Sequence, residues 1–147
     1  MPQEESTPTQ TPSAQMEEDL QHTVLYIEDN HINLLLVREI LLTRPDITFL
    51  SAADAEVGIE LAQARCPDLI LMDINLPGMD GIAATKQLQI YKETREIPVI
   101  AVSAYATEAD QKKAKAAGFK DYITKPFNIS ELLETIDVIL KQNLQRL

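Results

Sequence analysis

The sequence predicts an α/β fold with a doubly wound, five-stranded parallel sheet and five helices. Three observations support this prediction: strand-like and helix-like segments alternate, the connections between them are short, and two of the strands are continuous apolar runs. A continuous apolar run of this length is typical of a strand covered on both faces. Right-handed crossovers then put helices on both sides of the sheet.

Five segments have the composition and length of strands. Residues 23–27 (TVLYI) and 47–52 (ITFLSA) are short runs rich in β-branched and aromatic side chains. Residues 68–72 (DLILM) and 98–104 (PVIAVSA) are the continuous apolar runs, and residues 121–124 (DYIT) form the shortest strand. These segments supply all five strands of the expected sheet.

Five further segments have the apolar periodicity of helices. They are residues 31–42, 55–65, 81–92, 107–118 and 128–144. Asp54 and Thr107 are suitable N-caps, and Gly118 is a suitable end for its helix. Each helix follows one strand, which completes five β-α units.

The first 22 residues differ from the rest in composition. They are mostly Pro, Ser, Thr, Gln and Glu, and residues 1–20 contain five acids and no Lys or Arg. Such a segment buries too little apolar surface to offset its ordering entropy. We therefore expect residues 1–22 to be a disordered tail or linker and residues 23–144 to form one domain.

The charge and cysteine content exclude several classes of function. The net charge is −10, and no basic stripe is present that would bind nucleic acid or an anionic membrane. Cys66 is the single cysteine, so no disulfide or thiolate metal site is expected. Because no secretory signal or long apolar run occurs, we expect a cytoplasmic chain.

Chemically distinctive residues follow the predicted strands. Glu28 and Asp29 follow the first strand, Asp73 the third, Ser103 lies at the end of the fourth, and Lys125 follows the fifth. The carboxyl ends of parallel strands meet at one edge of the sheet, where ligands bind. Three carboxylates there would repel one another unless a hard divalent cation such as Mg²⁺ sat among them.

This arrangement predicts specific roles. Asp29 and Asp73 would be direct metal ligands, Glu28 would act through a bound water, and Lys125 would offset the remaining charge. Taken singly, each residue has an ordinary explanation as a helix cap, a turn residue or a solvated lysine. Independent caps, however, need not produce this combination at the strand ends.

The motifs YIEDN, DLILMDINLPGMDGI, PVIAVSA and DYITKPF closely resemble those of bacterial response regulator receiver domains. The resemblance covers about residues 22–143. Within the family, these motifs are most similar to those of receivers attached to hybrid histidine kinases or of stand-alone receivers. It implies a flavodoxin-like strand order, 2-1-3-4-5. It also implies a signalling domain that catalyses only its own phosphorylation and dephosphorylation.

The resemblance assigns roles to individual residues. Asp73 is implied to accept a phosphoryl group from a phosphohistidine, in a reaction that needs Mg²⁺ or Mn²⁺. The backbone carbonyl of Asn75 would be a further metal ligand, and Lys125 and Ser103 would each hold a phosphoryl oxygen. The bond before Pro126 is expected to be cis.

The resemblance also implies a switch and partners. Phosphorylation should draw Ser103 inward and favour an inward rotamer of Tyr122, which changes the face formed by the fourth helix, fifth strand and fifth helix. Asn75 and Tyr105 should stand at the mouth of the site, where Tyr105 would shield the phosphoryl group. The expected partners are a histidine kinase or histidine phosphotransfer protein, with a possible downstream protein.

Three other classes of protein fit the sequence less well. A flavin-binding module would need a Ser/Thr/Gly-rich phosphate loop after the first strand, but the loop here, EDNHIN, is acidic. Phosphohydrolases that use an aspartyl phosphate typically carry a second acid two residues after the nucleophile, where Asn75 stands. A receiver-like domain used only for docking would not need the acids, Asp73, Ser103 and Lys125 together.

Overall fold

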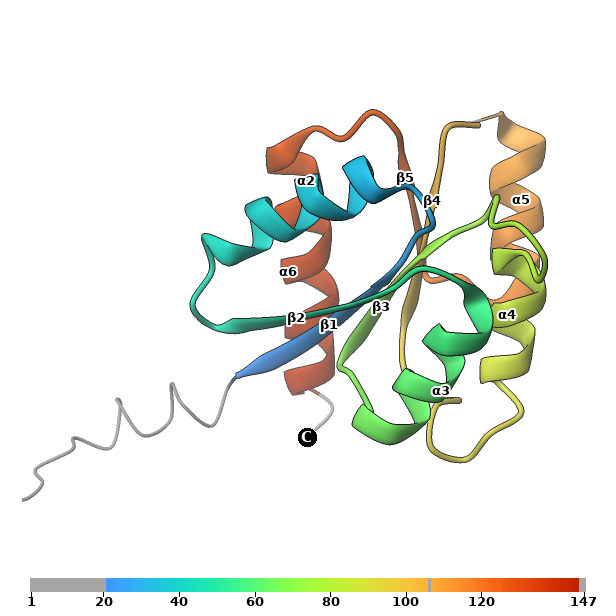
Figure 1. Ribbon diagram of the computed structural model, residues 1–147, viewed down its shortest axis with the longest axis horizontal. Coiled ribbons are helices and arrows are strands. Elements are labelled where there is room, and N and C mark those ends of the chain that lie inside the picture. The colour runs from blue at the N-terminus through green and yellow to red at the C-terminus, as the bar shows by residue number, and fades with distance from the viewer. Residues whose placement is uncertain (1–20, 106, 146–147) are drawn as a thin grey trace, which may run out of the picture.

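The computed structural model describes residues 21–105 and 107–145. Within these residues, five parallel strands form one sheet in the order β2-β1-β3-β4-β5 (Figure 1). The strands are β1 (His22–Ile27), β2 (Ile47–Ala52), β3 (Leu69–Asp73), β4 (Val99–Ser103) and β5 (Asp121–Thr124). The predicted fold class and strand order are both confirmed.

A helix follows each strand. The helices are α2 (His31–Leu42), α3 (Ala55–Arg65), α4 (Gly81–Leu88), α5 (Glu108–Ala117) and α6 (Ile129–Gln145). The predicted caps hold: Asp54 accepts a hydrogen bond from the Val57 N–H, Thr107 accepts one from the Asp110 N–H, and Gly118 ends α5 in the left-handed conformation. The short side-chain caps thus fix where α3 and α5 begin.

The sheet separates two apolar cores. α2 and α6 cover one face, while α3, α4 and α5 cover the other (Figure 1). β3 and β4 are buried along their whole length, as their continuous apolar sequences predict. The central strands are therefore rigidly enclosed, and their carboxyl ends are held in fixed positions.

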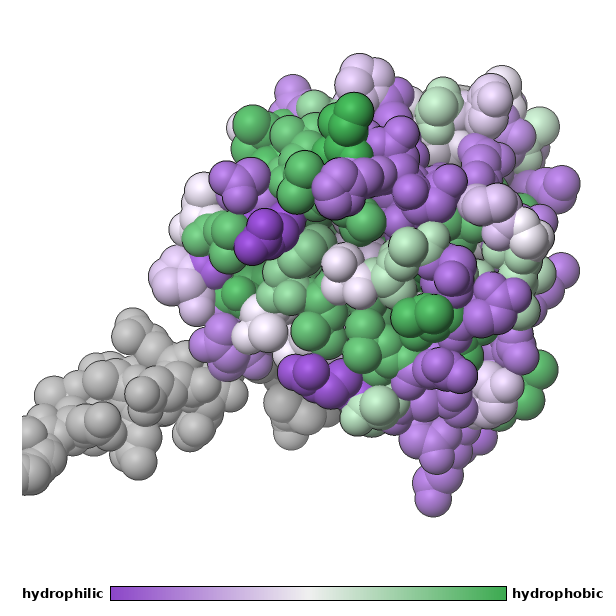
Figure 2. Space-filling model, in the orientation of Figure 1, coloured by the Kyte–Doolittle hydropathy of each residue, from purple (hydrophilic) through white to green (hydrophobic). Residues whose placement is uncertain are grey.

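Apolar side chains also reach the surface. Figure 2 shows a hydrophobic area over α2 and the start of α6, where Ile32, Leu35, Leu36 and Ile129 are exposed. Within the described residues, no helix is long and apolar enough to cross a membrane.

Several predicted boundaries differ from the structure. β1 begins at His22, which the prediction assigned to the tail, because its N–H donates to the Asp46 carbonyl and extends the pairing with β2. β3 includes Asp73, because this residue pairs with Val102 of β4. Residues 1–20 lie outside the described part of the chain, so the predicted disordered tail stays a prediction.

α4 is shorter than predicted. It ends at Leu88, whereas its apolar periodicity predicted a helix to residue 92. The Thr94 hydroxyl donates a buried 2.6 Å hydrogen bond to the Leu88 carbonyl, which satisfies a group that a longer helix would have bonded internally. The chain therefore leaves the helix in a turn that the periodicity alone did not reveal.

Candidate functional site

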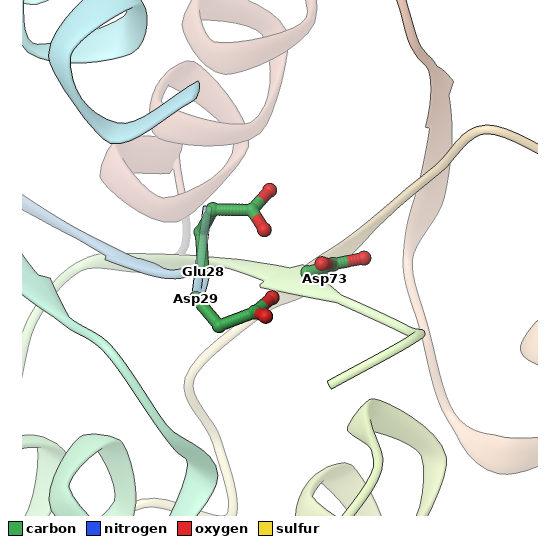
Figure 3. Close-up of side chains that lie close together, drawn as sticks. All are labelled: Glu28, Asp29 and Asp73. Atoms are coloured by element: carbon green, nitrogen blue, oxygen red, sulfur yellow. The ribbon is translucent and has the colours of Figure 1, made fainter. Parts of the chain in front are cut away.

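Three carboxylates meet at the carboxyl edge of the sheet. Glu28 and Asp29 follow β1 and Asp73 ends β3, and one oxygen from each lies within 4.8 Å of the others. Figure 3 shows the three side chains around a common space. Glu28 and Asp73 are buried, whereas Asp29 is exposed. The structure thus brings together the three acids predicted from separate parts of the sequence.

Strand pairing explains their proximity. β1 and β3 are parallel neighbours in a register that pairs Ile27 with Met72, so the next residue of each strand arrives at the same level. Gly81, the first residue of α4, lies against the backbone of Asp73. A Cβ atom there would lie 2.3 Å from the Asp73 carbonyl oxygen, so only glycine allows this approach.

Glu28 has several hydrogen-bond donors. Its Oε1 atom accepts from the Tyr26 hydroxyl at 2.7 Å and from the Asn33 side-chain amide at 3.5 Å, and its Oε2 atom accepts from the Asn30 N–H at 3.2 Å. Lys125 Nζ lies 2.6 Å from the same Oε1 atom. A carboxylate that is 99% buried needs such partners to remain charged.

Lys125 stands between two acids. Its Nζ atom lies 2.6 Å from Glu28 Oε1 and 3.5 Å from Asp73 Oδ2. The Lys125–Pro126 peptide bond is cis, as predicted, and the Lys125 N–H donates to the Ser103 carbonyl. The lysine therefore offsets part of the acidic charge, but its direct contact with Glu28 was not predicted.

The two buried acids titrate unequally. Burial, together with a hydrogen bond to Glu28 and the charge of Glu28, raises the pKa of Asp73 to about 6. Burial alone would raise the pKa of Glu28, but hydrogen bonds to Asp73, Lys125 and Tyr26 lower it to about 2. The nearer lysine and the tyrosine both favour charged Glu28, so Asp73 is the first of the two acids to take up a proton as the pH falls.

Sequence reasoning missed Tyr26 as a residue of the site. Its side chain is fully buried, and burial followed by the charge of Glu28 raises the pKa of its hydroxyl far above the ordinary value. The hydroxyl therefore stays protonated and donates to Glu28. One signal was available: residues two apart on a strand point to the same face, so Tyr26 and Glu28 are neighbours.

Ser103 lies at the same edge of the sheet. It is buried at the end of β4, and its Oγ atom accepts from the Tyr105 N–H at 3.1 Å and from the Asn75 side-chain amide at 3.3 Å. The Asn75 N–H in turn donates to Asp73 Oδ1 at 3.1 Å. Asn75 therefore links the serine to the aspartate.

Asn75 and Tyr105, the two residues expected at the mouth of the site, both contact Ser103. Both line a hollow of about 390 Å³ together with Ser103, Lys113 and Tyr122. The Tyr105 side chain is 62% exposed, and its backbone carbonyl accepts a hydrogen bond from the Tyr122 hydroxyl. Tyr122 of β5 is thereby connected to the loop that follows β4.

The donor set fits a hard divalent cation. Three carboxylates that offer oxygen atoms within 4.8 Å of one another match the preference of Mg²⁺ and Mn²⁺ for oxygen ligands. Glu28, Asp29 and Asp73 could together hold such an ion. The exposed position of Asp29 leaves one side of this cluster open to solvent.

The sequence of this chain matches one protein family over most of its length. Residues 24–137 match the model of the response regulator receiver domain. The chain belongs to the response regulator receiver family. The family assignment agrees with the strand order, and it identifies the chain as a receiver domain of two-component signalling.

Known proteins support the same conclusion. The response regulator DivK of Brucella ovis, described as a polar-differentiation regulator, is 39% identical over 114 residues, which is 78% of this chain and 92% of that protein. The receiver domain of a Pseudomonas aeruginosa PAO1 sensor histidine kinase is 30% identical, with a TM-score of 0.75 over 82% of this chain and 98% of that one. That structure has a magnesium ion coordinated in its active-site cleft.

A third similar protein is a CheY-like receiver domain from Methanospirillum hungatei JF-1. It is 26% identical, with a TM-score of 0.77 over 85% of this chain and 98% of that one. These receivers come from a response regulator, a sensor histidine kinase and a CheY-like receiver protein. The receiver fold therefore occurs in more than one type of parent protein.

Proposed function

We propose that this receiver domain accepts a phosphoryl group on Asp73 and thereby changes its surface. The observation that supports this best is the position of the Asp73 carboxylate, which ends a buried central strand within 4.8 Å of two other acids and 3.5 Å from Lys125. The rigid strand holds the nucleophile still, while acids and lysine supply the charges that phosphoryl transfer requires.

The transfer proceeds from a phosphohistidine of a partner protein. A carboxylate oxygen of Asp73 attacks phosphorus and forms an acyl phosphate, while the P–N bond breaks and the electron pair returns to the imidazole, which takes a proton from solvent. Asp73 must be ionised to attack. Its raised pKa of about 6 still leaves most molecules ionised at pH 7.

Other side chains stabilise the transferred group. Asp29, Asp73 and the Asn75 carbonyl would hold a Mg²⁺ or Mn²⁺ ion, with Glu28 acting through a bound water. The bound ion would neutralise charge on the phosphoryl oxygens. Lys125 would contact one of these oxygens, and the Ser103 hydroxyl, whose hydrogen is free to turn toward the site, would donate to another.

Phosphorylation then changes the face formed by α5, β5 and α6. When the Ser103 hydroxyl turns toward the phosphoryl group, the β4–α5 loop moves with it, since the Tyr105 N–H is bonded to Ser103. The hydrogen bond from Tyr122 to the Tyr105 carbonyl transmits this shift to β5. Tyr122 then favours an inward rotamer, and a downstream protein reads the altered face.

The partners follow from this chemistry. The donor is a histidine kinase or a histidine phosphotransfer protein, and the domain acts on no substrate other than itself. Labelling with acetyl phosphate tests the proposal: intact mass spectrometry should show one added phosphoryl group with Mg²⁺ present, and none with chelator or in Asp73→Asn. Equal labelling of wild type and Asp73→Asn would refute it.

A further inference from the structure

Tyr26 contacts both Glu28 and the loop that carries Lys125. The Tyr26 hydroxyl donates to Glu28 Oε1 at 2.7 Å, and the Tyr26 ring packs edge-on against Phe127, with centroids 6.4 Å apart and planes at 77°. Phe127 follows Lys125 by two residues in the loop between β5 and α6. Tyr26 therefore supports Glu28 on one side and the lysine loop on the other.

Lys125 and the Tyr26 hydroxyl share one acceptor atom. The lysine lies 2.6 Å from Glu28 Oε1, and the tyrosine hydroxyl lies 2.7 Å from the same oxygen. If Lys125 turns toward a phosphoryl group on Asp73, Glu28 loses its only close cation among the described residues. A carboxylate that is 99% buried is costly to leave with fewer donors.

We propose that Tyr26 is a positioning residue for phosphoryl transfer, whose hydroxyl keeps Glu28 hydrogen-bonded while Lys125 moves to the phosphoryl group. This inference rests on the proposed function of Asp73. Tyr26 sits deep in a core that includes Val24, Leu71 and Val102, so its hydroxyl cannot follow the lysine outward. The hydroxyl therefore stays hydrogen-bonded to Glu28 before and after Lys125 moves, and so does the Asn30 N–H.

The proposal predicts an effect that depends on the state of the site. In Tyr26→Phe, Glu28 keeps Lys125 as a partner before phosphorylation, so the affinity for Mg²⁺ alone should stay within about twofold of wild type. After Lys125 moves, Glu28 in this variant lacks both the lysine and the tyrosine hydroxyl as partners. The loss of one hydrogen bond to a charged group should then slow labelling by acetyl phosphate about tenfold or more.

The experiment compares Tyr26→Phe with Tyr91→Phe, which removes a tyrosine hydroxyl that accepts a hydrogen bond from Gln87 on α4, away from the acids. Three quantities are measured: labelling rate with acetyl phosphate at saturating Mg²⁺, affinity for beryllofluoride as a phosphoryl mimic, and affinity for Mg²⁺ alone. We expect Tyr26→Phe to lose about tenfold in the first two and little in the third. Tyr91→Phe should match wild type in all three.

A double-mutant cycle separates positioning from packing. Because the role of Tyr26 runs through the charge of Glu28, the loss caused by Tyr26→Phe should disappear when both proteins carry Glu28→Gln. An equal loss in the Glu28→Gln background would overturn the proposal, and so would wild-type labelling by Tyr26→Phe. If wild type itself fails to label, the proposed function of Asp73 fails instead.

A measurement on the wild-type chain tests the proposal even if the Tyr26→Phe variant does not fold. With ¹³Cζ-labelled tyrosine and ¹⁵Nζ-labelled lysine, addition of beryllofluoride and Mg²⁺ should shift the Lys125 resonance as the ammonium changes partner. The Tyr26 Cζ resonance should keep the position of a donor to a carboxylate. A Tyr26 resonance that moves to that of a free phenol would show that the hydroxyl leaves Glu28, and would contradict the proposal.

Discussion

Lys125 lies nearer to Glu28 than to Asp73, with its Nζ atom 2.6 Å from Glu28 Oε1 and 3.5 Å from Asp73 Oδ2. Both carboxylates are buried, so the ammonium group offsets charge that water cannot reach. This pairing makes the lysine important for stability before any phosphoryl group is present. It also means that the lysine must weaken one contact in order to strengthen another.

Lys125→Met should therefore destabilise the metal-free protein. Removing the cation leaves two buried acids facing each other, which should lower the free energy of unfolding by about 2–4 kcal/mol. Urea unfolding in chelator measures the loss, and millimolar Mg²⁺ should reduce it by restoring positive charge. As a control, the exposed Lys92→Met should change stability by less than about 0.5 kcal/mol. Equal effects of the two substitutions would contradict the role assigned to Lys125.

Asp73 should make stability depend on pH. Its pKa is about 6 in the folded protein against an ordinary value of 3.8, so the folded state binds more protons between these values. Stability of the metal-free protein should thus fall as pH rises from about 4 to 6, by on the order of 2 kcal/mol from this group. Asp73→Asn should lack this component and be more stable at pH 7. If the free energy of unfolding changes with pH in the same way in wild type and Asp73→Asn, the pKa of Asp73 is not raised.

Tyr105 should prolong the phosphorylated state. It lines a hollow together with Ser103 and Asn75. We propose that water approaches phosphorus from this hollow, in line with the leaving carboxylate. Tyr105→Ala should speed the loss of phosphate severalfold and leave the affinity for Mg²⁺ nearly unchanged. The decay of labelled protein after donor removal measures this. Because Tyr105 is 62% exposed, identical half-lives would assign it to a partner-binding surface instead.

Arg44 should stabilise the end of the molecule opposite the site. Its guanidinium group binds Asp46 and Asp137 through two oxygens each, which ties the segment before β2 to α6. These side chains are 27–40% exposed, so solvent weakens the pairs, and Arg44→Met should cost about 1 kcal/mol. Chemical unfolding at low and high salt measures the cost, with the exposed Arg38→Met as a control. A salt-independent loss equal to that of the control would show that the pairs contribute nothing.

Hydrophobic patterning predicted the sheet because each strand has a local signal. Continuous apolar runs identify β3 and β4, whose side chains meet helices on both faces. The end of α4 had no such signal. It depends on a hydrogen bond from Thr94 to Leu88, six residues away, and no Gly or Pro marks the stop.

The acid cluster could be predicted because its residues lie at or just after the ends of predicted strands. Parallel strands bring their carboxyl ends to one edge of the sheet. The partner of Lys125 could not be predicted in the same way, since its position depends on the loop after β5 and on side-chain rotamers. The role of Tyr26 was hidden for a different reason. A tyrosine in an apolar strand is usually a core residue, and only the structure shows its hydroxyl on Glu28.

The most direct measurement locates the phosphoryl group itself. Protein labelled with acetyl phosphate and Mg²⁺ is treated with borohydride, which reduces an acyl phosphate to an alcohol and so converts the modified aspartate to homoserine. Peptide mass spectrometry should find homoserine at position 73, in the peptide that spans the end of β3, and nowhere else. Homoserine at Asp29 or at another acid, or unmodified Asp73 in protein that carries the label, would contradict the assignment of Asp73 as the phosphoacceptor.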